Sequence, residues 1–469
     1  MPKGKDEHLK KMDAARLPVV PFPRSWRQGE GFVAAEKAKG MAPEIRQEPG
    51  GPAGEDYRLE ISPDAVVVTA ADSTGAFHGR LTWRQLQAAA ASGLDIPCGV
   101  IEDGPAYSWR GMLLDCGRHF MDVAFIKRVI DLLAIHKFNV LHWHLTEDQG
   151  WRLEVPGLPR LTEIAAWRAG NSEGPDTSPY GGYYTTADVR EILAHAAENH
   201  ITVVPEIEMP GHCVAALAAY PELSCTGGPF EVETEWGIFP DIYCAGNQET
   251  FAFLEKVLAH VMDLFPSRYI HIGGDEAPKD RWRKCSRCQG RITAEGLADE
   301  EALQSWFIQR IGKFLAAHGR RMIGWDEILE GGLAPGATVQ SWRGFEGATT
   351  AVQAGHDAIV SPTSHCYFDY PMDKLDLKQV YSFNPVPPGL TEPEQRRILG
   401  GELNLWTERI PQDRVDFMLF PRLCAMAECL WTGPERPGFE NFSERLEGHL
   451  NRLSKDKELQ IKPGPVGNS

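Results

Sequence analysis

The chain has 469 residues, and its 48 Lys and Arg against 65 Asp and Glu give a formal net charge of −17. This acidity excludes a nucleic acid as the main partner, because a phosphate-binding surface needs a stripe of Lys and Arg. No window approaches 18 uncharged apolar residues, so no insertion into a membrane is expected. The charged amino terminus lacks the apolar centre of a signal peptide, and the ten cysteines are scattered, so we expect a cytoplasmic location.

The first part of the chain, residues 1–104, is predicted to form a small α+β domain. Residues 57–86 contain two strand-like alternating runs around Pro63 and Asp64, followed by a glycine-containing turn and a helical pattern. The domain boundary is expected near Asp103-Gly104-Pro105. Residues 105–435 are then left for a catalytic domain, and residues 436–469 for a C-terminal helical extension and tail.

Beyond this boundary, short apolar runs alternate with amphipathic stretches. The predicted strands are 111–116, 140–145, 202–208, 269–274, 321–325, 338–342, 358–361 and 399–405. The predicted helices are 122–136, 186–199, 248–264, 300–318, 345–354 and 412–430, with a further one at 212–219. Eight strands separated by helices are what a (β/α)8 TIM barrel needs, although a doubly wound open sheet has the same alternation.

Polar and aromatic residues follow every one of the eight predicted strands. In chain order they are Arg118 and His119; Glu147 and Asp148; Glu206, Glu208 and His212; Asp275 and Glu276; Trp325, Asp326 and Glu327; Trp342 and Arg343; Tyr367 and Asp369; and Trp406 and Glu408. In a barrel these strand ends meet on one face, which is where such enzymes place their active sites. The pattern therefore favours the barrel over the open sheet.

The residue types on this face suit a neutral, polyhydroxylated ring. Tryptophan planes cover the apolar faces of a sugar, while carboxylates and arginine bind its hydroxyls. Hydrolysis of a glycosidic bond also needs a carboxylic acid that protonates the leaving oxygen. The most suggestive acids, Asp275 and Glu276, are adjacent, and neighbouring side chains at a strand end diverge. They cannot easily flank the anomeric carbon from opposite sides, which favours a substrate that supplies its own nucleophile.

Seven motifs in order make the sequence recognisable: RGMLLDCGRHF, FNVLHWHLTEDQGWR, PEIEMPGH, HIGGDE, IGWDEIL, QSWRG and GGELNLWTE. Together they resemble the family 20 glycoside hydrolases, the β-N-acetylhexosaminidases. The resemblance implies a TIM barrel behind a small α+β domain and removal of terminal non-reducing β-linked N-acetylglucosamine or N-acetylgalactosamine. It also implies substrate-assisted retention through an oxazolinium intermediate, a known exception to the two-carboxylate scheme. No cofactor is implied.

The resemblance assigns roles residue by residue. Glu276 corresponds to the general acid/base, Asp275 to the residue that holds the acetamido N–H, and Tyr367 to the hydroxyl on the acetamido oxygen. His212 corresponds to the histidine that supports the general acid with an acidic residue of the second strand. The sugar-binding residues would be Arg118, Asp148, Trp325, Trp342, Asp369, Trp406 and Glu408.

One position departs from the family pattern. The chain has Glu147-Asp148 where the family usually has two aspartates, so it stays open which of the two carboxylates supports the general acid. The preference between the two sugar epimers, the natural aglycone and the oligomeric state stay open as well.

Two other interpretations come from different classes of protein. His142, His144 and His271 could serve a metal-dependent hydrolase, although hydrogen-bonded structural roles are the commoner use of such histidines. A non-catalytic sugar-binding protein is the second alternative. The Cys285-x-x-Cys288 pair has no second CxxC and no obvious histidine partner, so we expect two free thiols and no metal there.

Overall fold

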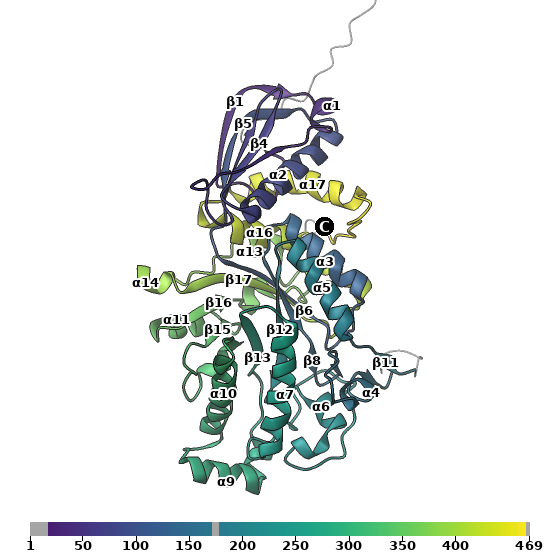
Figure 1. Ribbon diagram of the computed structural model, residues 1–469, viewed down its shortest axis with the longest axis vertical. Helices are drawn as coiled ribbons and strands as arrows, with labels where there is room; N and C mark the ends of the chain where they lie inside the picture. Colours follow the sequence, from purple (N-terminus) through teal and green to yellow (C-terminus); the bar gives the residue numbers. More distant parts are fainter. Residues whose placement is uncertain (1–16, 171–177, 466–469) are drawn as a thin grey trace, which may run out of the picture.

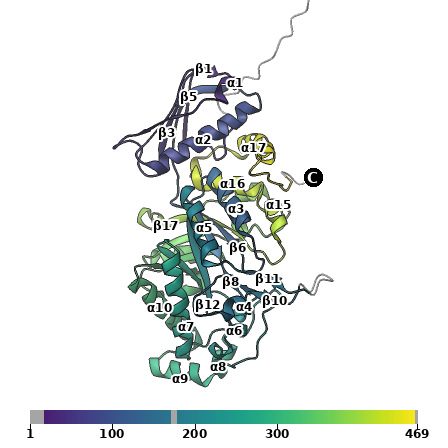
Figure 2. The ribbon, with the colours of Figure 1, turned by 45° about the vertical axis from the view of Figure 1, so that its right-hand side comes forward.

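The computed structural model describes residues 17–170 and 178–465 (Figures 1 and 2). Within these ranges, all eight predicted strands form a closed parallel barrel. The prediction of a TIM barrel is confirmed, and the alternative prediction of a doubly wound open sheet is wrong. Every strand begins and ends within two residues of its predicted bounds. The barrel strands are β6 (Trp109–Asp115), β7 (Val140–His144), β12 (Thr202–Met209), β13 (Tyr269–Gly273), β14 (Arg321–Trp325), β15 (Thr338–Ser341), β16 (Asp357–Val360) and β17 (Ile398–Leu405).

The interior of the barrel is filled in layers. Near the start of the strands, Trp109, Val140, Val204, Ile323 and Ile359 form an apolar cluster. The next layer is polar and fully buried, with His142, Glu206, His271, Gln340 and Glu402. A barrel interior is a packed core and not a pore, and here its upper half is packed with hydrogen-bonded polar groups.

Two glutamates hold the polar layer together. Glu402 accepts hydrogen bonds from His142 Nδ1 at 2.7 Å and Gln340 Nε2 at 2.8 Å. Glu206 accepts a hydrogen bond from His144 Nδ1, and its Oε1 lies 2.7 Å from His271 Nδ1. Burial alone would lower the pKa of His142, but the two carboxylates raise it to about 9. The hydrogen-bonded roles predicted for His142 and His144 are therefore confirmed.

Helices cover the outside of the barrel. The longer ones are α3 (Val123–Ile135), α5 (Thr186–Glu198), α7 (Gln248–Leu264), α10 (Glu300–Ala317), α11 (Glu346–Gln353) and α16 (Arg422–Trp431). The single helix predicted at 412–430 is wrong. The segment contains α15 (Val415–Leu419) and α16, separated at Phe420 and Pro421, because proline has no N–H to continue the helix.

Shorter elements lie in the loops between strands and helices. They are α4 (Arg160–Glu163), α6 (Val214–Ala219), α8 (Asp280–Lys284), α9 (Ser286–Glu295), α12 (Thr363–Cys366), α13 (Leu377–Tyr381), α14 (Glu392–Gln395), the ribbons β8 (Thr146–Glu147) with β9 (Gly150–Trp151) and β10 (Trp167–Arg168) with β11 (Tyr180–Gly181), and the 3-10 turns η1 (Pro221–Leu223), η2 (Asp326–Leu329), η3 (Gln412–Arg414) and η4 (Gly433–Glu435).

The small N-terminal domain is a five-stranded sheet with helices, as predicted. Its strand order is β1-β5-β3-β4-β2. The strands are β1 (Ser25–Val33), β2 (Glu44–Gln47), β3 (Tyr57–Ile61), β4 (Val66–Ala70) and β5 (Ile96–Asp103), with α1 (Ala35–Ala38) and α2 (Ser73–Ala91). Asp72 caps α2 by accepting from the N–H groups of Thr74 and Gly75.

A buried ion pair joins the small domain to the barrel. Asp103, at the end of β5, pairs with Lys137 Nζ at 2.9 Å and accepts a hydrogen bond from Trp431 Nε1 at 3.0 Å. The C-terminal helix α17 (Phe439–Lys455) lies between α2 and α16 (Figure 1). Its Arg445 forms a buried pair with Glu428 of α16 at 2.6 Å. The C-terminal segment thus packs on both domains.

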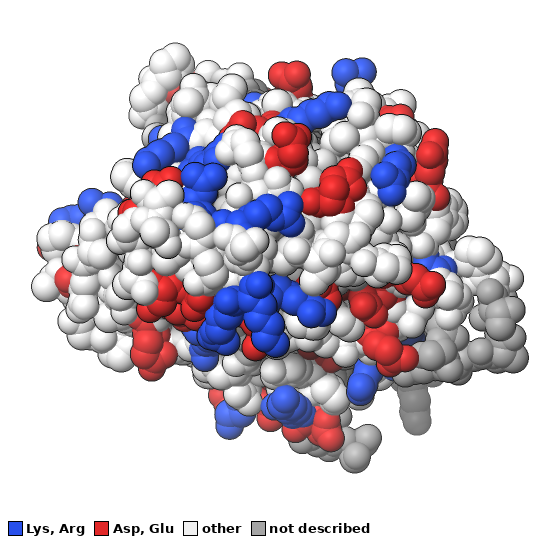
Figure 3. Space-filling model, turned by 90° about the horizontal axis from the view of Figure 1, so that it is seen from below, with Lys and Arg blue, Asp and Glu red and all other residues white. Residues whose placement is uncertain are grey.

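The surface carries charges of both signs. On the face seen from below, each group of basic side chains has acidic side chains beside it, as far as the described residues show (Figure 3). Among the described helices, none has the length and the apolar composition needed to cross a membrane.

Candidate active site

A pocket of about 230 Å³ lies where the barrel strands end. Eleven of the twelve predicted site residues line it: Arg118, Glu147, His212, Asp275, Glu276, Trp325, Trp342, Tyr367, Asp369, Trp406 and Glu408. The twelfth, Asp148, lies behind His212. Two further lining residues, Glu208 and Tyr370, were not among the predicted site residues.

The two adjacent acids follow β13, and the glycines before them are required by close packing. Gly273 has a positive φ of 67°, and a Cβ there would lie 1.7 Å from Glu208 Oε2. Glu276 itself has a positive φ of 42°, and His212 one of 47°. Non-glycine residues in this region cost about 1–3 kcal/mol and concentrate at functional sites. The backbone strain thus falls on two of the residues that the sequence singled out.

His212 stands between the two pairs of acids. Its Nε2 lies 3.4 Å from Glu276 Oε2 and 3.7 Å from Asp275 Oδ2. Asp275 and Glu276 therefore share one edge of the same imidazole and do not face each other across the pocket. The neighbouring carboxylates raise the pKa of His212 well above its ordinary value against the opposing effect of burial, which favours the protonated ring.

Both acids after β7 approach the other nitrogen of His212. Asp148 accepts a hydrogen bond from Nδ1 at 3.1 Å and a second one from the Val214 N–H at 2.9 Å. Glu147 Oε1 lies 2.8 Å from the same Nδ1 but also 3.3 Å from Arg118 Nη2. Burial raises the pKa of Asp148, whereas Arg118 and His212 overcome burial and lower the pKa of Glu147. Asp148 thus orients the imidazole of His212, and the negative charge of Glu147 stabilises the protonated form of that ring.

Arg118 is held at the side of the pocket by three carboxylates. Its guanidinium pairs with Asp115 and Glu147 at 3.3 Å and with Glu408 at 3.6 Å. Its Cζ also lies 5.0 Å from the centre of the Trp406 ring. A guanidinium held in this way is presented in a fixed direction, which suits recognition of vicinal hydroxyls.

Aromatic side chains form the walls. The rings of Trp325 and Trp406 are 5.7 Å apart, and those of Trp342 and Tyr367 are stacked at 6.2 Å. Trp342 Nε1 donates to Glu327 Oε2 at 3.0 Å, which fixes the orientation of its indole. Burial keeps the pKa of Tyr367 well above its ordinary value, so its hydroxyl remains available as a donor.

Three carboxyl groups have raised pKa values: Asp275 and Asp369, which line the pocket, and Glu327, which contacts the lining residue Trp342. Burial raises the pKa of Asp275 to about 7, and burial together with Asp275 raises the pKa of Glu327 to about 8. Burial and the charge of Glu408 raise the pKa of Asp369 to about 7. Perturbed acids gathered in one cleft are typical of an active site.

Several buried polar atoms of the pocket lack a hydrogen-bond partner among the described residues. They include Asp275 Oδ1, Asp369 Oδ1 and Trp325 Nε1. Buried polar groups are nearly always satisfied in folded proteins, so such groups in a pocket indicate a polar ligand. Asp369 and Asp275 thus offer acceptors, and Trp325 a donor, to a ligand with many hydroxyl and amide groups.

The sequence of the barrel matches the family model described as "Glycosyl hydrolase family 20, catalytic domain" over residues 107–434. Residues 36–104 match the model of "Glycosyl hydrolase family 20, domain 2". The chain belongs to glycosyl hydrolase family 20. The predicted resemblance is confirmed, and membership in a family of glycoside hydrolases favours neither the metal-dependent hydrolase nor the non-catalytic alternative.

Curated relatives in this family carry the same name. A "Beta-hexosaminidase" of Porphyromonas gingivalis is 44% identical over 85% of this chain and 53% of its own length, so the chain spans about half of that relative. A "Beta-hexosaminidase" of Akkermansia muciniphila is 36% identical over 86% of this chain and 85% of its own. Sequence similarity thus covers both domains.

Solved structures of family 20 members superpose closely. A crystal structure of a β-N-acetylhexosaminidase is 32% identical, with a TM-score of 0.89 over 96% of this chain and 98% of its own. An exo-β-N-acetylglucosaminidase of Vibrio harveyi, solved in complex with N-acetylglucosamine, is 29% identical, with a TM-score of 0.86 over 97% of this chain and 79% of its own.

A second cavity, of about 350 Å³, adjoins the pocket of this family 20 chain. It shares Asp369, Tyr370, Trp406 and Glu408 with the pocket and adds Trp236 and Arg409. Sequence reasoning missed Trp236 because it lies in a long irregular loop after β12, with no strand end to mark it. Its ring lies 5.1 Å from the guanidinium carbon of Arg168, which places it at the rim.

Proposed function

We propose that this protein is an exo-acting, retaining β-N-acetylhexosaminidase that removes one terminal β-linked N-acetylhexosamine at a time. The observation that carries the proposal is the small pocket in which Asp275, Glu276 and Tyr367 meet tryptophan walls. Its volume of about 230 Å³ suits one sugar ring, and the adjoining cavity leaves room for the aglycone. Family membership supports the same reaction class.

The proposed nucleophile is the carbonyl oxygen of the substrate's own 2-acetamido group. Asp275 would accept the acetamido N–H, and the Tyr367 hydroxyl would donate to the acetamido oxygen. Fixing both ends of the group holds the oxygen near the anomeric carbon, and such positioning can contribute several kcal/mol to catalysis. An ionised Asp275 would also stabilise the positive charge that develops on the oxazolinium ring.

Glu276 is the proposed general acid and base. As the acetamido oxygen bonds to the anomeric carbon, the glycosidic bond breaks and Glu276 gives its proton to the leaving oxygen. Glu276 then takes a proton from the water that opens the oxazolinium ring with net retention. His212 would act as the positioning residue for Glu276. Asp148 orients its ring, and the negative charge of Glu147 favours its protonated form.

The remaining lining residues would hold the sugar in place. Arg118 is proposed to bind the 3- and 4-hydroxyls, and Asp369 and Glu408 to accept from the 4- and 6-hydroxyls. Trp325, Trp342 and Trp406 would enclose the apolar faces of the ring. Because both Asp369 and Arg118 line the pocket and would lie near the 4-hydroxyl, we propose that both the N-acetylglucosamine and the N-acetylgalactosamine epimers are accepted.

Hydrolysis of aryl β-N-acetylglucosaminides and β-N-acetylgalactosaminides tests the proposed activity. We expect release of the aryl group from both, and the ratio of kcat/KM gives the epimer preference. If neither epimer is hydrolysed, the proposed activity is refuted. If only one is hydrolysed, the activity stands and only the dual specificity is refuted.

Inhibition by a thiazoline analogue of the intermediate tests the mechanism. We expect competitive inhibition much tighter than substrate binding, because the analogue resembles the oxazolinium ring. Trapping of a covalent glycosyl ester on a carboxylate, in contrast, would mean that the enzyme and not the substrate supplies the nucleophile.

We also propose a cytoplasmic location, since none of the ten described cysteines forms a disulfide, which suits a reducing compartment. Fractionation of the source cells followed by activity assays would test it, and activity confined to the exterior would contradict it.

A further inference from the structure

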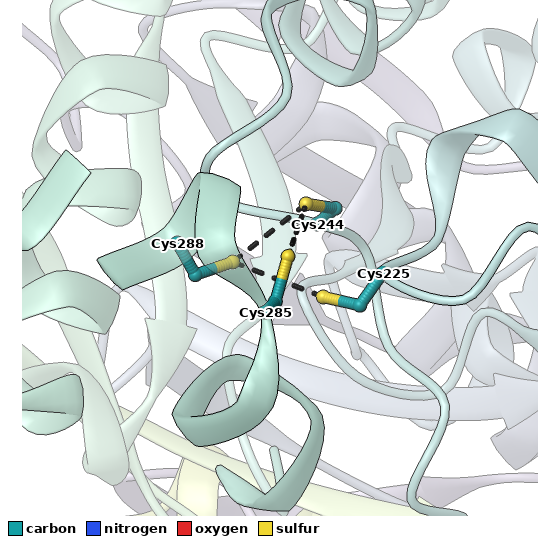
Figure 4. A group of neighbouring side chains, drawn as sticks. All are labelled: Cys225, Cys244, Cys285 and Cys288. Carbon is teal, nitrogen blue, oxygen red and sulfur yellow. Dashed lines mark hydrogen bonds between the residues drawn. The ribbon is translucent and has the colours of Figure 1, made fainter. Parts of the chain in front are cut away.

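Four cysteines meet at one point although they are far apart in the sequence (Figure 4). Cys225 follows η1, Cys244 precedes α7, and Cys285 and Cys288 flank the start of α9. The ligand atoms of all four lie within 4.8 Å of one another. We name this group, Cys225, Cys244, Cys285 and Cys288, the cysteine cluster.

We propose that the cysteine cluster is a structural zinc site with four cysteine ligands. The expectation of two free thiols at Cys285 and Cys288 is thereby revised. The sequence pairs these two with no second CxxC, but the fold supplies Cys225 and Cys244 as the remaining ligands. Four protein sulfurs with no open position are the ligand set of a structural rather than a catalytic zinc ion.

The spacing of the sulfurs fits one tetrahedral ion. Cys244 Sγ lies 3.6 Å from Cys288 Sγ and 3.8 Å from Cys285 Sγ, and Cys225 Sγ lies 3.8 Å from Cys288 Sγ. A tetrahedral ion with Zn–S bonds of about 2.3 Å holds its sulfurs about 3.8 Å apart. A disulfide would need about 2.05 Å, and an iron–sulfur cluster would hold the cysteine sulfurs much farther apart around its inorganic core.

The backbone around the cysteine cluster is built for close approach. A Cβ on Gly246 would lie 2.1 Å from the carbonyl carbon of Arg287 and 2.4 Å from the amide nitrogen of Cys288. Only glycine therefore allows the turn after Cys244 to pack against the CxxC turn.

Neighbouring contacts lock the two turns together without using the cysteines. Trp282 Nε1 donates to the Tyr243 carbonyl at 2.9 Å, and Arg287 Nη2 donates to the Ser224 carbonyl at 2.6 Å. The positive charge of Arg287 next to Cys244 also offsets part of the negative charge that four thiolates bring. Cys244, Cys285 and Cys288 are buried and Cys225 is half-buried, so the ion would be shielded from solvent.

The cysteine cluster joins two segments that both reach the sugar pocket. Cys225 and Cys244 close the long loop that carries Trp236, while Cys285 and Cys288 follow the turn that carries Asp275 and Glu276. Within the loop, the Glu233 N–H donates to the Asp148 carbonyl at 3.1 Å, and Gln149 Nε2 donates to the Glu235 carbonyl at 2.6 Å. The ion would thus fix the rim of the pocket without touching the substrate.

Binding of Zn²⁺ releases the thiol protons to solvent and changes no oxidation state. Elemental analysis of the full chain, purified under reducing conditions and incubated with ZnCl₂ followed by desalting, should give about one zinc per chain. The variants Cys244→Ser and Cys288→Ser should lose it, and the control Cys98→Ser, which changes a buried cysteine of β5 outside the cluster, should keep it.

Two measurements on the unaltered chain keep the test decisive if a variant fails to fold. Titration with a mercurial thiol reagent should release one zinc per chain to a chromophoric chelator, and Co²⁺ in place of zinc should give the visible absorption of a tetrahedral thiolate site. The proposal is overturned if the reduced chain binds no zinc, if iron is the bound metal, if Cys288→Ser retains the zinc, or if mass spectrometry finds the four cysteines in disulfides. None of these outcomes depends on glycosidase activity.

Discussion

The sugar pocket draws its residues from the ends of eight strands, whereas the cysteine cluster draws four residues from the loops after β12 and β13. The pocket combines backbone strain with perturbed charges: His212 and Glu276 have positive φ angles, and buried carboxyl groups have raised pKa values. The cysteine cluster contains four identical ligands whose sulfur atoms all lie within 4.8 Å of one another. The contrast separates a site arranged for chemistry from one arranged for rigidity, and the two meet only at the rim of the pocket.

The largest effect is expected for Glu276→Gln. The amide cannot donate or accept the proton, so kcat on substrates with poor leaving groups should fall about 10²–10⁴-fold. The zinc content and the melting temperature should stay unchanged. Parallel kinetics on an activated aryl substrate serve as the control, because a good leaving group needs less acid catalysis and should lose less activity. Equal losses on both substrates would contradict the assigned role.

Loss of the cysteine cluster should lower the melting temperature and leave the catalytic rate nearly unchanged, the opposite of the result expected for Glu276→Gln. Cys288→Ser should lower the melting temperature by about 5 °C or more, since removing a bound ion that closes two loops costs several kcal/mol. The kcat of the remaining folded protein at low temperature should change less than about tenfold, because none of the four cysteines is among the described residues that line the sugar pocket. Differential scanning calorimetry beside Cys98→Ser checks the first expectation. An unchanged melting temperature would mean that the ion has no structural role.

The raised pKa of Asp275 gives the pocket a pH-dependent stability. The folded state binds the Asp275 proton more tightly than the unfolded chain does, so its contribution to stability is present at low pH and is lost as the pH rises towards about 7. Asp275→Asn removes the buried charge. It should therefore raise the melting temperature by about 2–5 °C more at pH 8 than at pH 5.

A matched control for this measurement is Asp373→Asn, because Asp373 is exposed. It should give the same shift, within error, at both pH values. If Asp275→Asn shifted the melting temperature equally at both pH values, as the control does, the pKa of Asp275 would have to be the same in the folded and the unfolded chain.

The smallest effect concerns the rim, where the two regions meet. Trp236→Ala removes an aromatic surface from the outer cavity, so KM for a disaccharide substrate should rise about threefold, with little change in kcat for a small aryl substrate. Removal of zinc should reproduce this change in KM, because the same loop is closed by Cys225 and Cys244. If Trp236→Ala had no effect on either substrate, the outer cavity would not bind the aglycone.

Much of the fold and the pocket could be predicted because barrel strands are short buried runs with polar residues directly after them. The broken helix at 412–430 was missed because its apolar periodicity continues across Pro421, which nonetheless ends the first half. Glu208 was noted at a strand end but not chosen as a site residue, and the structure places it in the lining of the pocket, where a Cβ at Gly273 would clash with its carboxylate. Tyr370 and Trp236 lie in irregular segments.

The cysteine cluster could not be predicted for a different reason. Its two halves are separated by α7 and β13, and the parallel pairing of β12 with β13 brings the loops that carry them together. A CxxC pair marks half of a metal site, whereas Cys225 and Cys244 carry no local signal. The glycine at 246 is the feature that could have pointed to a close approach.

The charged layer inside the barrel limits how this protein can evolve. Glu206 and Glu402 each serve several partners, so a single substitution there would leave a buried group without its counterpart, at a cost of about 3–5 kcal/mol. Residues of this polar layer would therefore have to be substituted together with their partners. Substitutions on the exposed surface of the loops at the mouth leave this layer intact, and new substrate preferences would therefore arise there first, while the inherited reaction persists underneath.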